Sequence, residues 1–189
     1  MAARDRPGAL PTLLKGIVGL FTGRARTPAK APGARTPRST ASAPAVDAGR
    51  RGQTATREVA PPPRNGLRIT YAPQRDGAPD AGEVVWTWVP YEENDGRGKD
   101  RPVLVIAREG ADRVFAVRLT SKAHDGDRDY LSIGTGAWDS QGRASWVDIE
   151  QLYSVHVRGL RREAAALDRA RFASVASALG RRYGWASEV

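Results

Sequence analysis

Hydrophobic and polar residues alternate along the middle of this chain in the manner of β-strands. In the segment 83–89, Val84, Trp86 and Trp88 fall on one face, which predicts a strand with two unlike faces. Residues 102–107 are continuously apolar and predict a strand that is buried on both faces. Further strands are predicted for the ranges 114–120, 130–133 and 145–157, and a short edge strand or extended segment for 67–71.

The period changes to that of a helix near the end of the chain. Asp168 is a suitable N-cap and Gly184 a suitable stop signal. Between them the apolar residues recur at helical spacing: Phe172, Val175, Ala176, Leu179 and Tyr183. Short strands followed by one packing helix predict a mainly β domain with helices (α+β). We expect a small β-barrel at residues 81–185 whose C-terminal helix covers one face.

The first 66 residues are rich in Pro, Ala and Arg, and no aromatic residue occurs from 23 to 65. Such a segment cannot bury enough surface to offset the entropy of ordering, so we expect residues 1–66 to be disordered and dispensable for activity. The exception is a short helix at 12–21, which is too short to span a bilayer. A transient helix is favoured there over one that docks on a membrane surface or a partner. Residues 67–80 are expected to form a linker or an edge strand.

Positive charge is concentrated in the same tail. Residues 1–66 hold twelve Lys and Arg against three acidic residues, whereas residues 67–189 hold eighteen of each, so the predicted domain is neutral. The tail can attract RNA or DNA in a non-specific, salt-sensitive way, but the domain as a whole is not a basic nucleic-acid binder. The absence of cysteine excludes disulfides, thiolate zinc sites and cysteine nucleophiles, and it favours a cytoplasmic protein. With only two histidines, a histidine-rich metal site is not expected.

The most specific segment is 82–122, where a charged, glycine-containing loop places Arg101 directly before a buried strand. The following strand ends at Thr120. Taken alone, Arg101 fits an ion pair with an acidic neighbour at the rim of the domain better than catalysis, and Thr120 fits a turn. Cations that flank these two positions would follow a phosphate backbone: Arg97, Lys99, Arg118 and Lys122.

The order and spacing of these motifs resemble those of the PemK/MazF family, the toxins of type II toxin–antitoxin pairs. The resemblance is carried by Gly82-Glu83-Val84, Arg101-Pro102-Val103-Leu104-Val105-Ile106, Leu119-Thr120-Ser121-Lys122 and Trp146-Val147-Asp148-Ile149-Glu150-Gln151-Leu152. It spans about residues 81–183 and leaves the tail uncovered. The resemblance implies an SH3-like barrel that forms a homodimer and cleaves single-stranded RNA as a metal-independent endoribonuclease. It also implies that no cofactor is used and that an antitoxin peptide neutralises the dimer.

The same resemblance implies that Arg101 is the catalytic arginine and Thr120 the catalytic hydroxyl residue, and Ser121 is an adjacent candidate. Cleavage by the RNA 2′-hydroxyl needs a proton acceptor, a proton donor and a cation for the growing charge on the phosphate. A guanidinium suits the third role because it offers a planar fork of donors, but its pKa above about 12 makes it a poor base. His124 is a candidate general base because its free pKa is near neutrality, although its acidic neighbours favour an exposed loop.

Two other functions stay open at this stage. The loop before Arg101 reads Glu92-Glu93-Asn94-Asp95. It lacks the glutamine of the Ser-Glu-Gln-like stretch that many family members have there. A barrel that binds nucleic acid or protein without cleaving it is therefore the first alternative. A similar barrel serves toxins that poison gyrase through their C-terminal end, and Trp185 is expected to be exposed there. Trp86 and Trp88 are expected to be core or dimer contacts rather than platforms for RNA bases.

Overall fold

The computed structural model describes residues 47–189 except 75, 77 and 94, and of residues 161–164 it describes the backbone alone. The helix predicted at residues 12–21, and the rest of the predicted tail before residue 47, lie outside this range. Within it, no helix has the length and apolar character needed to cross a membrane.

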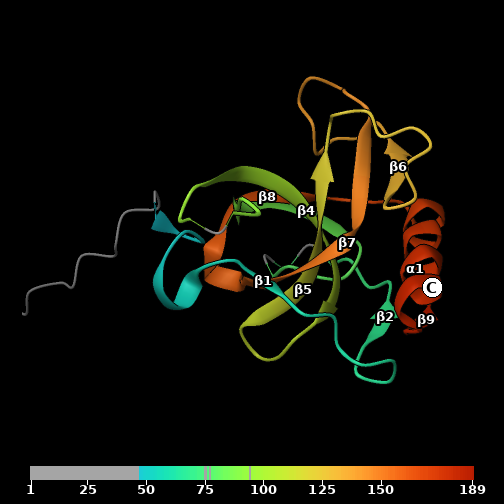
Figure 1. Ribbon diagram of the computed structural model, residues 1–189, viewed down its shortest axis with the longest axis horizontal. Helices are drawn as coiled ribbons and strands as arrows, with labels where there is room; N and C mark the ends of the chain where they lie inside the picture. The colour runs from blue at the N-terminus through green and yellow to red at the C-terminus, as the bar shows by residue number, and fades with distance from the viewer. Residues whose placement is uncertain (1–46, 75, 77, 94) are drawn as a thin grey trace, which may run out of the picture. The chain divides into compact units, whose positions relative to one another are not determined.

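Seven strands form one antiparallel sheet in the order β1-β7-β5-β4-β3-β8, and β6 also pairs with β7 (Figure 1). The strands of this sheet are β1 (Arg57–Val59), β3 (Glu83–Pro90), β4 (Gly98–Arg108), β5 (Arg113–Thr120), β6 (Tyr130–Gly134), β7 (Ser145–His156) and β8 (Leu160–Ala166). A separate parallel pair consists of β2 (Arg68–Thr70) and β9 (Ala186–Glu188). The prediction of a mainly β domain with a C-terminal helix is confirmed.

The sheet is open, which differs from the closed barrel that the sequence suggested. One edge of β7 is shared by two short strands, β6 along its first half and β1 along its second half. In the described part of the chain neither of them pairs with β8, so the two ends of the sheet do not join. β8 itself was not predicted, because its arginine-rich sequence is typical of a solvated surface, yet it pairs with β3.

The C-terminal helix α1 (Arg169–Tyr183) has the caps that the sequence predicted. The Asp168 carboxylate accepts a hydrogen bond from the backbone N–H of Arg171 (3.0 Å), and Gly184 ends the helix with a φ of 77°. Its apolar face, including Phe172 and Leu179, is fully buried in a large cluster that we call the helix-side cluster. In Figure 1 the helix lies beside β6 and the β2–β9 pair, and it also contacts β7.

A second, smaller apolar cluster lies between the strands on the other side of the sheet. We call it the valine cluster, and its members are Val85, Val89, Val103, Val105, Val114, Ala116, Tyr153 and Val155. Small branched side chains suit strands that are buried on both faces, which explains the continuous apolar sequence of β4. The valine cluster ends where β4 and β5 carry their arginines.

Residues 47–63, which we call the arm, lie on the sheet and do not belong to a disordered tail. They contain the 3-10 helix η2 (Gly52–Thr54) and strand β1, which follow each other in the cyan part of the ribbon in Figure 1. In β1, Glu58 is opposite Tyr153 of β7. The expectation of disorder through residue 66 is therefore wrong for the arm. The arm is ordered because β1 pairs with β7, a strand far along the chain. Apolar periodicity in the sequence does not predict such pairing.

Three contacts fix the arm to the domain. Gly49 approaches Gly159, in the 3-10 helix η3 (Val157–Gly159), so closely that a Cβ atom on Gly49 would lie 2.6 Å from the Gly159 carbonyl oxygen. The buried hydroxyl groups of Thr56 and Thr87 are 2.8 Å apart. Arg113 donates hydrogen bonds to two carbonyl oxygens of the arm, at 3.0 and 2.7 Å. The arm is therefore an integral part of the domain.

Candidate active site

Antiparallel pairing brings the predicted catalytic residues to neighbouring strand ends. The pairing of β4 with β5 ends at Val103 and Arg118, and Arg101 and Thr120 each lie two residues beyond that pair on their own strand. On its other side Arg101 is paired with Thr87 of β3. Because side chains alternate along a strand, Arg101, Val103 and Thr87 face the valine cluster. The end of the valine cluster is thus where cationic and hydroxyl side chains gather.

Arg101 is half-buried, and its guanidinium forms no ion pair with a residue that the structure describes. Its Nε is buried and has no hydrogen-bond partner among the described residues. Burial lowers the pKa of Arg101, and the positive charge of Arg118 lowers it further. The rim ion pair that the sequence alone favoured for Arg101 is not present among the described residues. A buried cation with a free N–H donor is prepared for an external anion.

Arg118 is a second buried arginine, and Asp148 of β7 holds it. The Nη2 atom of Arg118 lies 2.5 Å from Oδ2 of Asp148, while its Nε is buried without a hydrogen-bond partner among the described residues. Burial acts to lower the pKa of Arg118, but its interactions with Tyr153 and Asp148 prevail and raise it. The other carboxylate oxygen of Asp148 accepts two backbone N–H groups, at 2.9 and 3.4 Å. Asp148 is therefore fully engaged as a structural partner.

A tyrosine and a histidine adjoin this pair. The hydroxyl of Tyr130 on β6 is 3.4 Å from both Arg118 Nη2 and Asp148 Oδ2, and burial, followed by the charge of Asp148, raises its pKa. His124 stacks on Tyr130, with ring centroids 3.6 Å apart, and its Nδ1 is 3.4 Å from Asp127. The histidine thus reaches the arginine pair only through Tyr130, and its side chain is more enclosed than the exposed loop that we expected.

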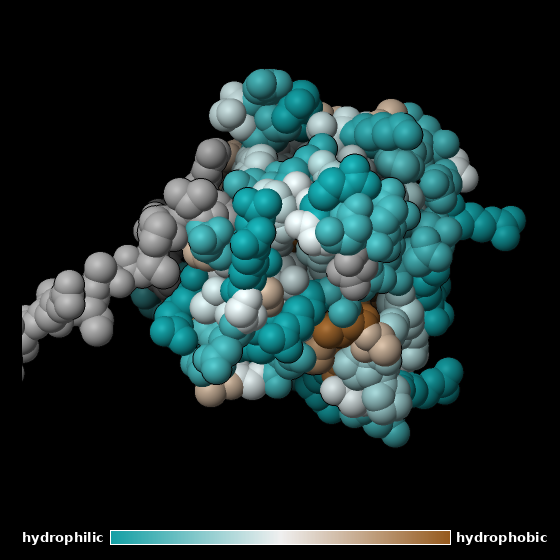
Figure 2. Space-filling view, turned by 60° about the vertical axis from the view of Figure 1, so that its left-hand side comes forward, coloured by the Kyte–Doolittle hydropathy of each residue, from teal (hydrophilic) through white to brown (hydrophobic). Residues whose placement is uncertain are grey.

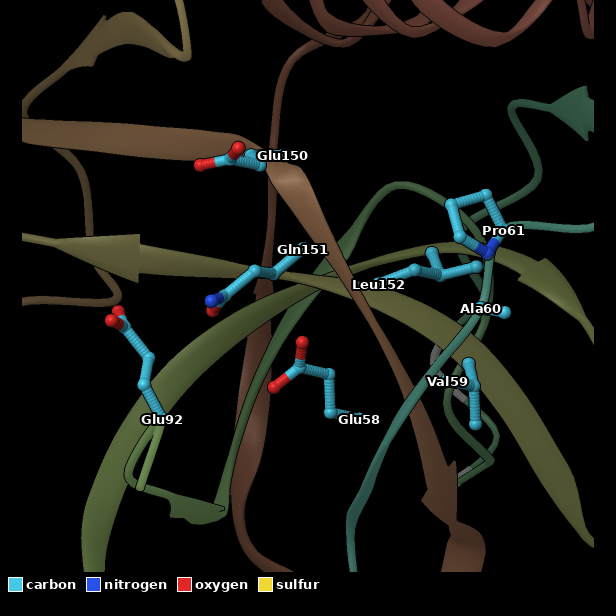
Figure 3. A pocket seen from close by; sticks show the side chains of 8 residues that line it. All are labelled: Glu58, Val59, Ala60, Pro61, Glu92, Glu150, Gln151 and Leu152. Carbon is cyan, nitrogen blue, oxygen red and sulfur yellow. The ribbon is translucent and has the colours of Figure 1, made fainter. Parts of the chain in front are cut away.

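A groove with acidic side chains lies next to Arg118. An open groove of about 420 Å³ is lined by Glu58 of the arm, Glu92 of the β3–β4 loop, and Glu150 and Gln151 of β7. Figure 3 shows the head groups of Glu58, Glu92 and Gln151 directed toward the same opening. Glu92 is exposed and its Oε1 lies 3.6 Å from Arg118 Nη2. The groove therefore adjoins the arginine pair at Glu92, which lines the groove and lies beside Arg118.

The other predicted site residues are spread around this centre. The Thr120 hydroxyl accepts a hydrogen bond from the backbone N–H of Lys122 (3.2 Å), so the predicted turn and the predicted site coincide. Ser121 and Lys122 are exposed in that turn. Lys99 is exposed on β4, two residues before Arg101. Arg97 lies in the β3–β4 loop and forms an ion pair with Asp95 (2.6 Å).

Sequence reasoning missed the residues that orient Arg118. Asp148 and Tyr130 were not singled out, although a signal was present. Two charged residues of opposite sign interrupt apolar runs, Arg118 between Val117 and Leu119 in β5 and Asp148 between Val147 and Ile149 in β7. A charged side chain that is buried in an apolar strand needs a partner of opposite charge, so an ion pair between Arg118 and Asp148 could have been predicted. Tyr130 offered no comparable signal, because an aromatic residue in a strand is common.

The terminal aromatic differs from the expectation. Trp185 is 3% exposed, and its indole N–H donates to the carbonyl oxygen of Pro62 (3.0 Å). It also stacks on Tyr183, with ring centroids 4.5 Å apart. The exposed C-terminal aromatic that favoured a gyrase-poisoning toxin is therefore absent from this end of the domain.

Comparison with known proteins supports the resemblance seen in the motifs. Residues 80–182, more than half of the chain, match the model of the PemK-like, MazF-like toxin of type II toxin-antitoxin system. Similar solved structures include MazE-MazF (Form-II) from Deinococcus radiodurans, at 27% identity over 57% of this chain and 96% of that chain (TM-score 0.43). The Mycobacterium tuberculosis toxin MazF-mt6 has 18% identity over 53% of this chain and 97% of that chain (TM-score 0.39).

An endoribonuclease in complex with its cognate antitoxin from Mycobacterial species is also similar, at 19% identity over 57% of this chain and 96% of that chain (TM-score 0.44). No curated protein sequence matches the chain. The matched range 80–182 contains Arg101, Arg118, Thr120 and Asp148 but leaves out the arm. On the strength of that match, the chain belongs to the PemK-like, MazF-like toxin family of type II toxin–antitoxin systems.

Proposed function

We propose that this protein is the toxin of a toxin–antitoxin pair and that it cleaves single-stranded RNA at a phosphate held by Arg101 and Arg118. One observation carries the proposal. Two neighbouring arginines each keep a buried Nε–H without a hydrogen-bond partner among the described residues. Leaving such donors unpaired is costly, and a phosphate diester would satisfy both, since guanidinium groups bind phosphate oxygens with directional, charge-assisted hydrogen bonds.

In the proposed reaction the 2′-oxygen of the RNA forms a bond to phosphorus while the bond to the 5′-oxygen breaks. The products are a 2′,3′-cyclic phosphate and a 5′-hydroxyl, and no metal is needed. Arg101 and Arg118 stabilise the additional negative charge of the transition state. Glu92 takes the proton of the 2′-hydroxyl, because it is the exposed carboxylate beside Arg118, whereas Asp148 is buried and fully bonded. Water at the open groove protonates the leaving 5′-oxygen.

Thr120 and Ser121 complete the proposed site at the end of β5. Thr120, like Arg101, lies two residues beyond the last β4–β5 pair, and its hydroxyl can position a phosphate oxygen while its turn holds it in place. Ser121 is exposed and offers a second hydroxyl next to it. Lys99 and Lys122 are exposed on either side and would follow the backbone of the bound strand.

The partners proposed for this chain follow from its family. The similar D. radiodurans structure is named MazE-MazF, and a similar mycobacterial endoribonuclease is named in complex with its cognate antitoxin. We propose that this chain likewise forms a homodimer and is neutralised by an antitoxin peptide that covers the RNA site. The acidic rim at Glu58, Glu92 and Glu150 favours cationic residues in the part of the antitoxin that lies there.

A cleavage assay tests the proposal. Purified wild type, Arg101→Ala and the control Arg181→Ala, which changes an exposed arginine of α1, are incubated with long single-stranded RNA in EDTA. We expect wild type and control to produce fragments with 5′-hydroxyl ends, and Arg101→Ala to be slower by at least about 100-fold. A chimeric substrate with 2′-deoxynucleotides should resist cleavage at each replaced position.

Two results would oppose the proposal in different ways. Equal cleavage by wild type and Arg101→Ala would trace the activity to a contaminant or to another site. RNA binding by a folded wild type that never cleaves would indicate a binding protein of the same family. In that case the changed loop at Glu92–Asp95 would be the first place to examine.

A further inference from the structure

A second groove lies between the arm and the β3–β4 loop, and no step of the proposed reaction uses it. Its volume is about 390 Å³, and its main polar and aromatic side chains are Arg50, Arg57, Glu58, Trp88 and Arg97. We call it the basic groove. It borders the acidic groove at Glu58, which lines both. The matched family range starts at residue 80, so two of its three arginines come from a segment outside that range.

The arm places one of these arginines on an aromatic ring. The guanidinium carbon of Arg50 lies 4.6 Å from the ring centroid of Trp88, within the range of a cation–π contact. Trp88 is half-buried, whereas Arg50 is exposed. The Trp88 side chain borders an open groove, so of the two roles that the sequence predicted, a core contact or a dimer contact, it does not have the first.

The charge of the basic groove is positive after its internal pairs are subtracted. Arg97 is balanced by Asp95, to which its Nε is bonded at 2.6 Å. Neither Arg50 nor Arg57 forms an ion pair with a described residue, and Glu58 is the one carboxylate of the lining. A groove with two guanidinium groups that have no carboxylate partner among the described residues, and with one indole ring, has the two elements that hold single-stranded nucleic acid, cations for phosphate and a ring for a base.

The basic groove is also connected to the candidate active site through consecutive residues. Thr87, which is paired with Arg101, directly precedes Trp88. The β3–β4 loop has Glu92 beside Arg118 at one end and Arg97 in the basic groove at the other. A strand of RNA that leaves the arginine pair along this loop would enter the basic groove. Figure 2, which turns the arm side of the molecule forward, shows a mostly hydrophilic surface with a small hydrophobic patch.

We propose that the basic groove is a binding subsite for a nucleotide of single-stranded RNA that flanks the cleaved phosphate, with the base on Trp88 and the phosphate on Arg50 and Arg57. The choice of RNA as ligand rests on the proposed function. The arm is then a substrate-binding element, and its docking contacts at Gly49 and Thr56 keep the two arginines in place. An acidic peptide would satisfy the arginines but would leave the indole ring without a stacking partner.

Binding of an uncleavable probe tests this subsite without reference to catalysis. A fluorescein-labelled, fully 2′-O-methylated 12-nucleotide strand is titrated with full-length protein, and anisotropy is measured over a series of salt concentrations. The test variant is Arg50→Gln/Arg57→Gln. The matched control is Arg51→Gln/Arg181→Gln, which removes two exposed charges outside the basic groove, one of them in the arm itself. Thermal denaturation confirms that all variants are folded.

We expect the test variant to bind the probe at least about tenfold more weakly at low salt. The logarithm of the binding constant should also depend less steeply on the logarithm of the salt concentration, with a slope smaller in magnitude by about 1.4, which is the value for two lost phosphate contacts to a single strand. The control should stay within about twofold. Trp88→Leu should weaken binding by about tenfold, whereas Trp88→Phe should retain most of it because a phenyl ring still stacks. A poly-glutamate peptide should displace the probe poorly.

Three outcomes would overturn the subsite: equal losses in test and control variants, equal binding by the two Trp88 variants, or displacement by poly-glutamate as effective as by unlabelled strand. Tighter binding or faster cleavage after removal of Arg50 and Arg57 would show that the arm obstructs RNA, which also contradicts the proposal. If wild type fails to cleave RNA but the binding differences hold, the proposed function fails and the subsite stands. If cleavage depends on Arg101 but the variants bind the probe equally well, the proposed function stands and the subsite fails.

Discussion

The two sides of the sheet are built differently, although both have an apolar cluster next to the strands. The helix-side cluster consists of large side chains such as Phe172, Leu179 and Trp138 and is covered by α1. The valine cluster is smaller, ends at Arg101, Arg118 and their partners, and borders the arm. The larger apolar cluster and the two buried arginines thus lie on different sides of the sheet. Charges can be desolvated at the end of the valine cluster because the helix-side cluster supplies most of the apolar burial.

The buried ion pair shows how the two sides differ in energy. Pairing Arg118 with Asp148 avoids the penalty of an isolated buried charge, yet such a pair adds little net stability over apolar residues of similar size. On the helix side, each fully buried large apolar side chain contributes about 1.5–3 kcal/mol. Stability alone therefore does not explain why Arg118 and Asp148 are paired in this place.

The largest expected effect comes from breaking this pair. We expect Asp148→Ala to lower the free energy of unfolding by about 3–5 kcal/mol, because Arg118 would stay buried without its carboxylate. The double variant Arg118→Met/Asp148→Leu, which makes this end of the valine cluster resemble the helix side, should be as stable as wild type or more stable. Urea denaturation measures both, and RNA cleavage by the stable double variant should still be lost.

The result for the double variant decides the comparison. If it is stable and still cleaves RNA at the wild-type rate, the ion pair has no role in binding phosphate. If it is much less stable than wild type, the pair is a net stabiliser and the two sides of the sheet are more alike than their composition suggests.

Much of the fold could be predicted because the spacing of apolar residues along the chain indicates which face of a strand or helix is buried. The five strands β3 to β7 and helix α1 follow apolar patterns of period two or 3.6, and the caps of α1 are local signals. β8 and the arm could not be found in this way. Their order comes from pairing with β3 and β7, partners that are distant in sequence, and few apolar side chains mark it.

Part of the candidate site could also be predicted from motifs and from the alternation of side chains along the strands. Arg101 and Thr120 carry motifs, and the alternation of their strands places them on one face. Arg118 was assigned to RNA binding from its charge alone. Its orientation by Asp148 depends on the pairing of β5 with β7, which a single sequence does not specify. The contribution of the arm to the groove was hidden because its composition resembles that of the preceding residues, for which the sequence predicts disorder.

A medium effect is expected from loosening the arm. Gly49→Ala would place a Cβ atom 2.6 Å from the Gly159 carbonyl oxygen and 2.8 Å from the Thr87 hydroxyl, at a φ of 77° that disfavours side chains. Gly52 has a similar φ of 68° but open space around it, so Gly52→Ala is a control for backbone strain alone. We expect Gly49→Ala to cost about 2–3 kcal/mol and Gly52→Ala about 1 kcal/mol.

Limited trypsin digestion measures the position of the arm directly, because Arg50, Arg51 and Arg57 are exposed cleavage sites within it. Cleavage at these arginines should be faster in Gly49→Ala than in Gly52→Ala, while the strands of the sheet stay protected. Identical digestion of the two variants would mean that the close approach to Gly159 does not hold the arm. The helix side should be unaffected in both.

The smallest expected effect is a dependence of stability on pH at His156, the residue opposite Arg113 at the arm side of the sheet. Burial lowers the pKa of His156, and the charges of Arg158 and Arg113 lower it further. Its Nδ1 accepts a hydrogen bond from the Arg158 backbone N–H (3.0 Å), which the protonated ring cannot do. The neutral ring is thus favoured in the folded state.

The stability that His156 contributes is therefore complete above the pKa of about 6.5 in the unfolded chain, and it is lost as pH falls through the lower pKa of the folded state. Urea denaturation of wild type and His156→Gln between about pH 7.5 and 5 measures this contribution as the difference between the two proteins. We expect wild type to lose its advantage over the variant as the pH falls. The helix-side cluster contains no group whose pKa is shifted within this pH range. If the difference in free energy of unfolding between wild type and His156→Gln does not change with pH, the stability of the arm side depends on pH no more than that of the helix side.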